Sequence, residues 1–247
     1  MKTILKIFLS LFLIVNASFA QDTLYVYKAG AVAYKSVISS VDSVTFKKVY
    51  YPVNDIDGNG YQMVKIGTQT WMASNLHVTH YRNGDVISNI TDNTAWSGLT
   101  TGAWCDYSNL VANGNKYGHL YNWYAVTDVR NIAPIGWHVP TDAEWTTLST
   151  YLGGQSVAGG KLKEVGTLNW TAPNTGATNE TGFSGLPGGS RQGDLGSFQS
   201  VGIVGSWLNS TESYGGVFSR QLLYNSSSMT SGLNSKNGGY SVRCIKD

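Results

Sequence analysis

Charged residues are scarce in this sequence, where Asp, Glu, Lys and Arg make up 13% of 247 residues. Two of the 17 basic residues, Lys2 and Lys6, stand in the first twenty positions, which hold no acidic residue. The rest of the chain therefore has 15 basic and 15 acidic residues and a formal net charge of zero. Phosphate binding requires a concentrated basic surface, so this balance argues against nucleic acid as a partner.

Long hydrophobic runs are also missing after the first twenty residues. The run from Ile7 to Val15 is broken only by Ser10, and it is much shorter than the roughly 20 residues that span a bilayer as a helix. Lysines before this run and the small residues Ser18 and Ala20 after it are typical of a signal peptide. We predict a signal peptide over residues 1–20, a mature chain without a transmembrane segment, and a secreted, periplasmic or cell-surface location. A retained N-terminal anchor is the alternative.

Cysteine is nearly absent, with only Cys105 and Cys244 in the chain. In an oxidising compartment two cysteines commonly form one bridge. We therefore predict a disulfide between Cys105 and Cys244, which would tie the C-terminal strand to the middle of the domain. Two separate buried thiols are the alternative.

Glycine and aromatic residues are abundant instead, with 29 glycines and 12% aromatic residues. Disordered chains are poor in aromatics and rich in charge, so this composition favours a loop-rich folded domain with aromatic anchors. Residues 21–50 alternate apolar and polar positions around Ala29-Gly30, which predicts a small N-terminal β module and linker. Residues 51–247 then form one domain.

The clearest local signal lies in the sequence Pro140-Thr141-Asp142-Ala143-Glu144. Thr141 and Glu144 have the spacing of a capping box, Trp145, Leu148 and Leu152 recur at helical spacing, and Gly153-Gly154 follows. We predict a helix of about three turns here and a second short helix over residues 158–165. The turn-rich residues 82–116 predict long loops. Alternation predicts strands over 197–203, 205–209, 217–224 and 240–245.

Metal-binding patterns are incomplete. Asp55, Asp57 and Asn59 resemble the start of a calcium loop, but Gly60 leads into a strand pattern without the later carboxylate, so we favour a hairpin turn. His77 and His80 lack nearby cysteine or histidine ligands for zinc. The oxygen-rich loops suit calcium chemically, but no ligand set can be assembled, and we predict no cofactor.

Seven blocks, in order over about residues 53–247, resemble the Fibrobacter succinogenes major paralogous domain. The blocks are VKIGTQTWMASNL, YGHLYNWYAV, GWHVPTDAEWTTL, GGKLKE, PNTGATNETGFSGLPGG, WLNSTE and GGYSVRCIKD. This resemblance implies an α+β fold related to the C-type-lectin-like fold of the formylglycine-generating enzyme. Members of that enzyme family use two neighbouring cysteines near the C-terminus to bind copper. Cys244 stands alone in its block, so we predict that the chain is not an enzyme.

Three functions remain in competition. The first is an exported domain that binds a glycan or a protein, with aromatic faces and amide groups in its loops. The candidate ligand-binding residues are Trp170, Asn174, Asn179, Glu180, Arg191 and Trp207, although Asn and Thr often satisfy the backbone of their own loops instead. The second is a structural or assembly component of the cell envelope, because free strands of the N-terminal module can add to another sheet. The third is an enzyme whose acid–base groups would come from His119, His138, Glu144 and Glu180.

Overall fold

The computed structural model describes residues 23–28, 31–37, 53–213 and 215–247. The chain divides into two compact units, Met1–Tyr50 and Tyr51–Asp247, which are described separately. In the first, β1 (Thr23–Lys28) pairs antiparallel with β2 (Ala31–Val37), and the register shifts between Val26 and Tyr27. The predicted signal peptide, residues 1–20, lies outside the described residues. No helix in the described part of the chain is long and apolar enough to cross a membrane.

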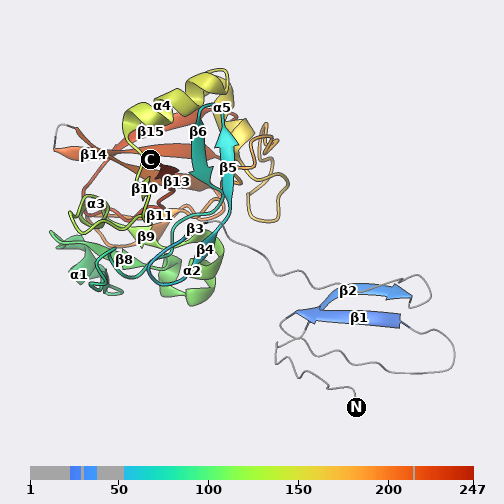
Figure 1. Ribbon diagram of the computed structural model, residues 1–247. Coiled ribbons are helices and arrows are strands. Elements are labelled where there is room, and N and C mark those ends of the chain that lie inside the picture. Colours follow the sequence, from blue (N-terminus) through green and yellow to red (C-terminus); the bar gives the residue numbers. More distant parts are fainter. Residues whose placement is uncertain (1–22, 29–30, 38–52, 214) are drawn as a thin grey trace, which may run out of the picture. The chain divides into compact units, whose positions relative to one another are not determined.

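The second unit is a mixed α+β structure with several small sheets (Figure 1). Its largest sheet has the strand order β10-β16-β6-β5, and three-stranded sheets are formed by β13-β14-β15 and by β7-β8-β9, with β3-β4 and β11-β12 as two-stranded pairs. The strands are β3 Val53–Asn54, β4 Gly60–Tyr61, β5 Met63–Ile66, β6 Gln69–Met72, β7 Ser88–Asn89, β8 Ala103–Cys105, β9 Leu120–Tyr121, β10 Trp137–His138, β11 Ser190–Arg191, β12 Phe198–Gln199, β13 Val204–Ser213, β14 Gly216–Leu223, β15 Met229–Asn234 and β16 Ile245–Lys246. The helices are α1 Asn93–Ser97, the 3-10 helix η2 Tyr107–Asn109, α2 Val111–Tyr117, α3 Trp123–Val126, α4 Asp142–Tyr151 and α5 Gln155–Leu162.

Helix α4 confirms the prediction made from its capping box. The Thr141 hydroxyl accepts a hydrogen bond from the Glu144 backbone N–H, and Glu144 Oε2 accepts one from the Thr141 backbone N–H at 2.7 Å. The two residues thereby satisfy backbone donors that a helix start leaves free. Trp145 and Leu148 are buried on the inner face of the helix, so they belong to the core as predicted.

Helix α5 begins and ends three residues earlier than predicted, and its two glycines have a packing role. A Cβ at Gly159 would lie 2.2 Å from the Ser228 carbonyl oxygen, and one at Gly160 would lie 2.3 Å from that of Gly176. Glycine therefore lets the helix approach two neighbouring backbone segments. In Figure 1, α4 and α5 lie together on one side of the unit, with α1 and α2 on the opposite side. The short helices α1 and α2, with η2, replace part of the loop predicted over residues 82–116.

The predicted disulfide is wrong. Both cysteines are free and buried, and they lie in different core clusters: Cys244 packs with Tyr61 and Tyr121, whereas Cys105 packs with Trp96 and Leu120. Burial raises the pKa of the Cys105 thiol to about 12 and also raises that of Cys244. The alternative of two separate buried thiols therefore holds.

Three buried cations connect the loops of this unit. Lys163, Arg191 and Arg243 are almost fully buried, and none forms an ion pair with a carboxylate among the described residues. Each donates instead to backbone carbonyls of segments distant in sequence. Buried carbonyls need such donors, so these side chains compensate for the small amount of regular structure.

Candidate functional site

Five of the seven motif blocks, with their flanking residues, meet at one cavity of about 220 Å³. The residues around it come from the segment after β6, the end of α2, the segment after α5, the loop before β11, and the segment before β16. They are Ala73, Ser74, Asn75, His77, Asn115, Lys116, Tyr117, Gly118, Glu164, Ser184, Leu186 and Arg243. We call this the Asn75 cavity.

Asn75 and Arg243 form the most buried part of its lining. Arg243 Nε and Nη2 donate to Asn75 Oδ1 at 3.0 and 2.7 Å, and Nη1 donates to the carbonyls of Met72 and Phe183 at 3.1 and 2.5 Å. A guanidinium has five N–H groups, so one N–H on Nη2 has no partner among the residues that the structure describes. Burial lowers the pKa of Arg243 to about 9, which leaves it charged at neutral pH.

A close crossing of two segments shapes one wall. Asn75 Nδ2 donates to the Tyr117 carbonyl at 2.7 Å, and the backbone N–H of His119 donates to the Leu76 carbonyl at 3.1 Å. Gly118, at φ 77°, lies between these contacts, and a Cβ there would be 2.7 Å from Asn75 Cβ. Glycine is therefore required at position 118 for both steric and backbone reasons.

Three ionisable side chains surround the rest of the cavity. Lys116 is exposed, with Nζ 5.0 Å from the centre of the Tyr117 ring. Glu164 accepts a hydrogen bond from Asn169 Nδ2 at 2.7 Å, and the half-buried His77 lies 5.3 Å from Tyr61 between ring centres. The lining thus has two positive charges, on Lys116 and Arg243, and one negative charge, on Glu164. This balance favours a ligand that carries oxygen acceptors.

The four acid–base groups proposed for an enzyme do not all meet: His138 and Glu144 contact each other, whereas His119 and Glu180 have other partners. His138 Nε2 contacts Glu144 Oε1 at 2.8 Å, and its Nδ1 contacts Asp247 Oδ1 at 2.6 Å. Both ring nitrogens of His138 are therefore engaged. Glu180 forms an exposed ion pair with Lys161 instead.

His119 belongs to a separate pair. Its Nδ1 contacts Asp106 Oδ1 at 2.7 Å, and its ring lies 4.0 Å from that of Trp104. Burial lowers the pKa of His119 despite this carboxylate, so the imidazole is neutral at pH 7. A nucleophile–base–orienter arrangement is not formed by these four predicted groups.

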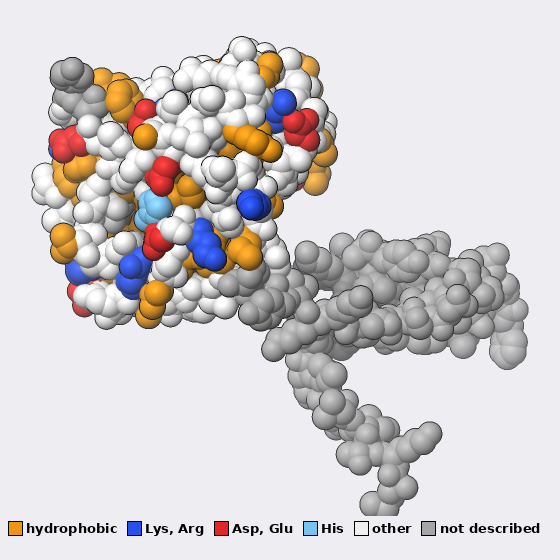
Figure 2. Space-filling model, turned by 45° about the horizontal axis from the view of Figure 1, so that its top comes forward, with side chains coloured by type: hydrophobic (Ala, Val, Ile, Leu, Met, Phe, Trp, Pro, Cys, Tyr) orange, Lys and Arg blue, Asp and Glu red, His pale blue; other side chains and the backbone are white. Residues whose placement is uncertain are grey.

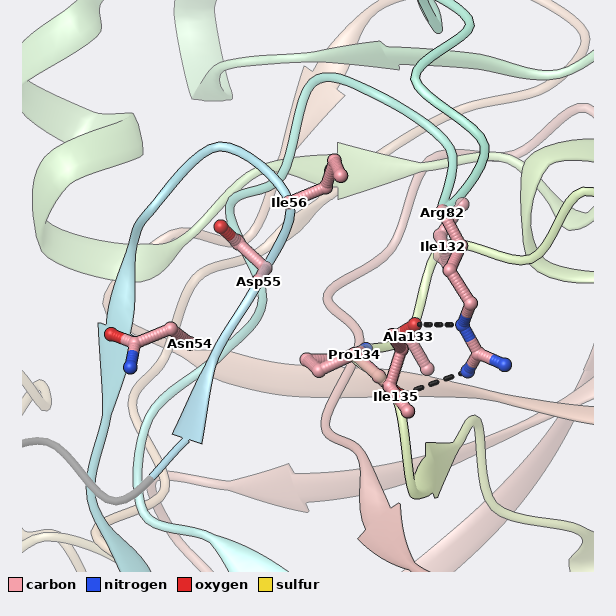
Figure 3. A pocket seen from close by; sticks show the side chains of 8 residues that line it. All are labelled: Asn54, Asp55, Ile56, Arg82, Ile132, Ala133, Pro134 and Ile135. Atoms are coloured by element: carbon pink, nitrogen blue, oxygen red, sulfur yellow. Dashed lines mark hydrogen bonds between the residues drawn. The ribbon is translucent and has the colours of Figure 1, made fainter.

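A second cavity, of about 200 Å³, lies between the β3–β4 hairpin and residues 132–135 (Figure 3). Arg82 donates to the carbonyls of Ala133 and Pro134 at 3.0 and 2.8 Å. The Asn54 amide and the outer nitrogen of Arg82 point away from this cavity. Ile56 projects from one side of the cavity and Pro134 from the other. Its main polar groups thus serve the fold or point away from the cavity.

The hairpin turn predicted at Asp55 is confirmed. Asp55 Oδ1 accepts hydrogen bonds from the backbone N–H groups of Asp57 and Asn59, and its Oδ2 accepts one from the Tyr61 hydroxyl at 2.6 Å. Asp57 Oδ1 contacts His80 Nδ1 at 2.6 Å.

Within the residues that the structure describes, no group of three or more His, Cys, Asp or Glu side chains is placed to hold a metal ion.

Four of the six predicted ligand-binding residues are buried and support the fold. Trp170 and Trp207 lie in the aromatic core, and their Nε1 atoms donate to internal acceptors at 3.0 and 2.8 Å. Arg191 donates to loop carbonyls, and Asn174 donates through Nδ2 to two more. A buried ring face cannot stack on a sugar, and the buried Arg191 and Asn174 donate to the fold's own carbonyls, so the burial of these four argues against their forming a binding surface.

The other two predicted residues are accessible. Asn179 is half-buried and, at φ 47°, accepts the Ser184 backbone N–H at 2.8 Å within its own loop. Glu180 is exposed in its ion pair with Lys161.

Sequence reasoning did not select Asn75 or Arg243. A usable signal was present, because each is a strongly polar residue inside a mostly apolar segment, WMASNL for Asn75 and YSVRCI for Arg243.

The family model described as the Fibrobacter succinogenes major domain matches residues 64–246. No curated protein and no solved structure matches the chain.

Proposed function

Because the chain belongs to the Fibrobacter succinogenes major domain family, and because five of its motif blocks meet at one cavity, we propose that it is an exported, non-catalytic domain that binds a small polar ligand in the Asn75 cavity. That convergence carries the proposal. A fold can be maintained by contacts spread through the whole core, whereas a binding site requires residues from separate segments in one place. The ligand is a glycan residue or a polar group of another protein.

The chemistry of the lining supports an oxygen-rich ligand. Among the described residues, Arg243 has a buried positive charge with no carboxylate partner and one N–H with no acceptor. The exposed Lys116 and the half-buried His77 also line the cavity and add further donors. Figure 2 shows charged side chains scattered among uncharged surface on one face of the molecule, which agrees with a ligand chosen by local hydrogen bonds rather than by a broad electrostatic field.

Export is proposed from the signal-peptide pattern of residues 1–20. The lack of catalysis is proposed on two grounds. His119 and Glu180 are paired with Asp106 and Lys161 and not with the His138–Glu144 pair, and Cys244 is the only cysteine in its motif block. A C-type-lectin-like arrangement, as in the formylglycine-generating enzyme, is proposed from the family resemblance and agrees with the small sheets and ordered loops of the second unit.

Binding can be tested by thermal unfolding of the full chain with D-galacturonate, D-galactose and L-glutamate, followed by a glycan array and a pull-down from the native cell surface. A ligand of the folded state raises Tm with its concentration. We expect at least one positive result, lost in Lys116→Ala combined with His77→Ala and kept in Lys65→Ala, an exposed lysine outside the cavity. Negative results in all three assays would contradict the proposal.

A second candidate, an envelope assembly component, is favoured by the N-terminal hairpin. Among the described residues, β1 and β2 pair only with each other. A two-stranded hairpin is marginally stable in water and can add to another sheet through its edges. Deleting residues 21–50 is expected to change localisation or oligomeric state under this candidate, and no change in either would argue against it.

A further inference from the structure

An open hollow of about 560 Å³ lies beside the last turns of α4, at a different place from the Asn75 cavity. Thr146, Thr147, Thr150 and Tyr151 line it from α4, and Gly67 and Thr68 line it from the turn between β5 and β6. No charged residue is in this lining. Four hydroxyl groups and one phenol ring therefore define its chemistry.

Tyr151 is exposed, yet its ring is supported on one side. The residue is 65% accessible, and an added Cβ at Gly67 would lie 2.8 Å from Tyr151 Cδ2. Glycine at position 67 thus allows the ring to lie close to the β5–β6 turn. A tyrosine has few rotatable bonds, so a ligand that contacts the ring restricts little side-chain freedom.

The threonine hydroxyls offer both donors and acceptors. Thr147 Oγ1 donates to the Ala143 carbonyl one turn earlier in α4 at 3.0 Å, which leaves its acceptor lone pairs for a ligand. Thr146 Oγ1 donates to the Asp142 carbonyl at 2.9 Å and accepts from Arg220 Nη2 at 3.1 Å, so it is held in place by the fold. The hydroxyls of Thr68 and Thr150 have no hydrogen-bond partner within the described segments of the chain, so each remains a donor and an acceptor for solvent or a ligand. The helix that carries three of these groups is fixed at its start by the capping box.

We propose that this hollow binds a neutral saccharide, with the C–H face of one sugar ring on Tyr151 and its hydroxyls hydrogen-bonded to the threonines. A sugar ring combines an apolar face with several hydroxyls, and both features have counterparts here. An acidic saccharide would gain no ion pair from this lining. The site does not depend on ligand binding in the Asn75 cavity.

The test is isothermal titration of the full chain with cellohexaose, maltohexaose and xylohexaose, with hexagalacturonate as the acidic comparison. We expect at least one neutral oligosaccharide to bind. Tyr151→Ala should weaken it by about tenfold, equivalent to about 1.4 kcal/mol, whereas Tyr151→Phe should keep it because the ring remains. Leu168→Ala, which shortens a side chain that is 89% exposed outside the hollow, is the control.

Three outcomes would overturn the proposal: no neutral oligosaccharide binds, Tyr151→Ala binds as well as the wild type, or only hexagalacturonate binds. Binding that survives Tyr151→Ala but is lost in Lys116→Ala with His77→Ala would place the sugar in the Asn75 cavity instead. That result would overturn the saccharide hollow and support the proposed function, so the two proposals fail separately. Tm measured for each variant shows whether the fold is retained.

Discussion

Replacing Lys163 with methionine tests whether the buried cations hold the loops together. Lys163 is fully buried at the end of α5. Its Nζ donates to the carbonyls of Thr175, Leu223 and Ser226 at 2.9, 2.8 and 2.8 Å. Methionine has a similar length and fills much of the same space, but it removes the charge and all three hydrogen bonds.

Two opposing terms set the magnitude. A buried acceptor left without a donor costs about 1–3 kcal/mol, so the three carbonyls together cost about 6 kcal/mol at the middle of that range. Burial lowers the pKa of Lys163 from 10.5 to about 8. This fall of about 2.5 pH units means that burying the charged lysine costs the wild type about 3.4 kcal/mol, a cost that is absent in the methionine variant. We therefore expect Lys163→Met to lower the free energy of unfolding by about 3 kcal/mol at pH 7.

The pH dependence provides a second measure of the same interaction. Between pH 8 and 10.5 Lys163 has lost its proton in the folded chain but keeps it in the unfolded chain. The unfolded state then binds more protons, so this group makes the wild type more stable as pH rises through that range. The methionine variant lacks the group. The stability difference between the two proteins should be smallest below pH 8 and should widen toward pH 10.5.

Urea denaturation followed by tryptophan fluorescence measures both effects, because all eight tryptophans lie in the unit Tyr51–Asp247. Lys161→Met is the matched control. Lys161 belongs to the same helix and forms only a partly exposed ion pair with Glu180, for which about 0–1 kcal/mol is expected. A loss below about 1 kcal/mol for Lys163→Met, with an unchanged m value, would refute the assignment of Lys163 as a structural support.

Two further predictions concern packing and the cysteines. Gly160→Ala should lower stability by about 1–3 kcal/mol from overpacking, because its Cβ would lie 2.3 Å from a carbonyl oxygen. Helix propensity alone predicts the opposite, a gain of about 1 kcal/mol. The sign of the change in Tm therefore decides between overpacking and helix propensity. Cys105 and Cys244 should both appear as free thiols in mass spectrometry of the unreduced protein, and since both are buried they should react with a thiol reagent only after unfolding. An unreduced protein with a mass two units below that of the dithiol form would contain a disulfide and would contradict the structure.

Features that depend on neighbouring residues could be predicted from the sequence. The capping box at Thr141 and Glu144 fixed the start of α4, because its hydrogen bonds join residues three positions apart. The turn around Asp55 followed from a similarly short pattern. Alternation indicated the long strand β14, although the strand β15, with its exposed Thr, Ser and Leu side chains, was not predicted.

The candidate site could not be predicted in the same way. Trp170 and Trp207 have the composition of a binding surface, but contacts with Phe183 and Trp145 from distant segments bury Trp207, and Trp170 lies in the same core cluster. The sequence alone determined the family, the class of fold and the local helix and turn signals. Only the tertiary structure decided which aromatic rings are buried, that the two thiols stay apart, and that Asn75 meets Arg243, because each of these depends on packing between segments far apart in the chain.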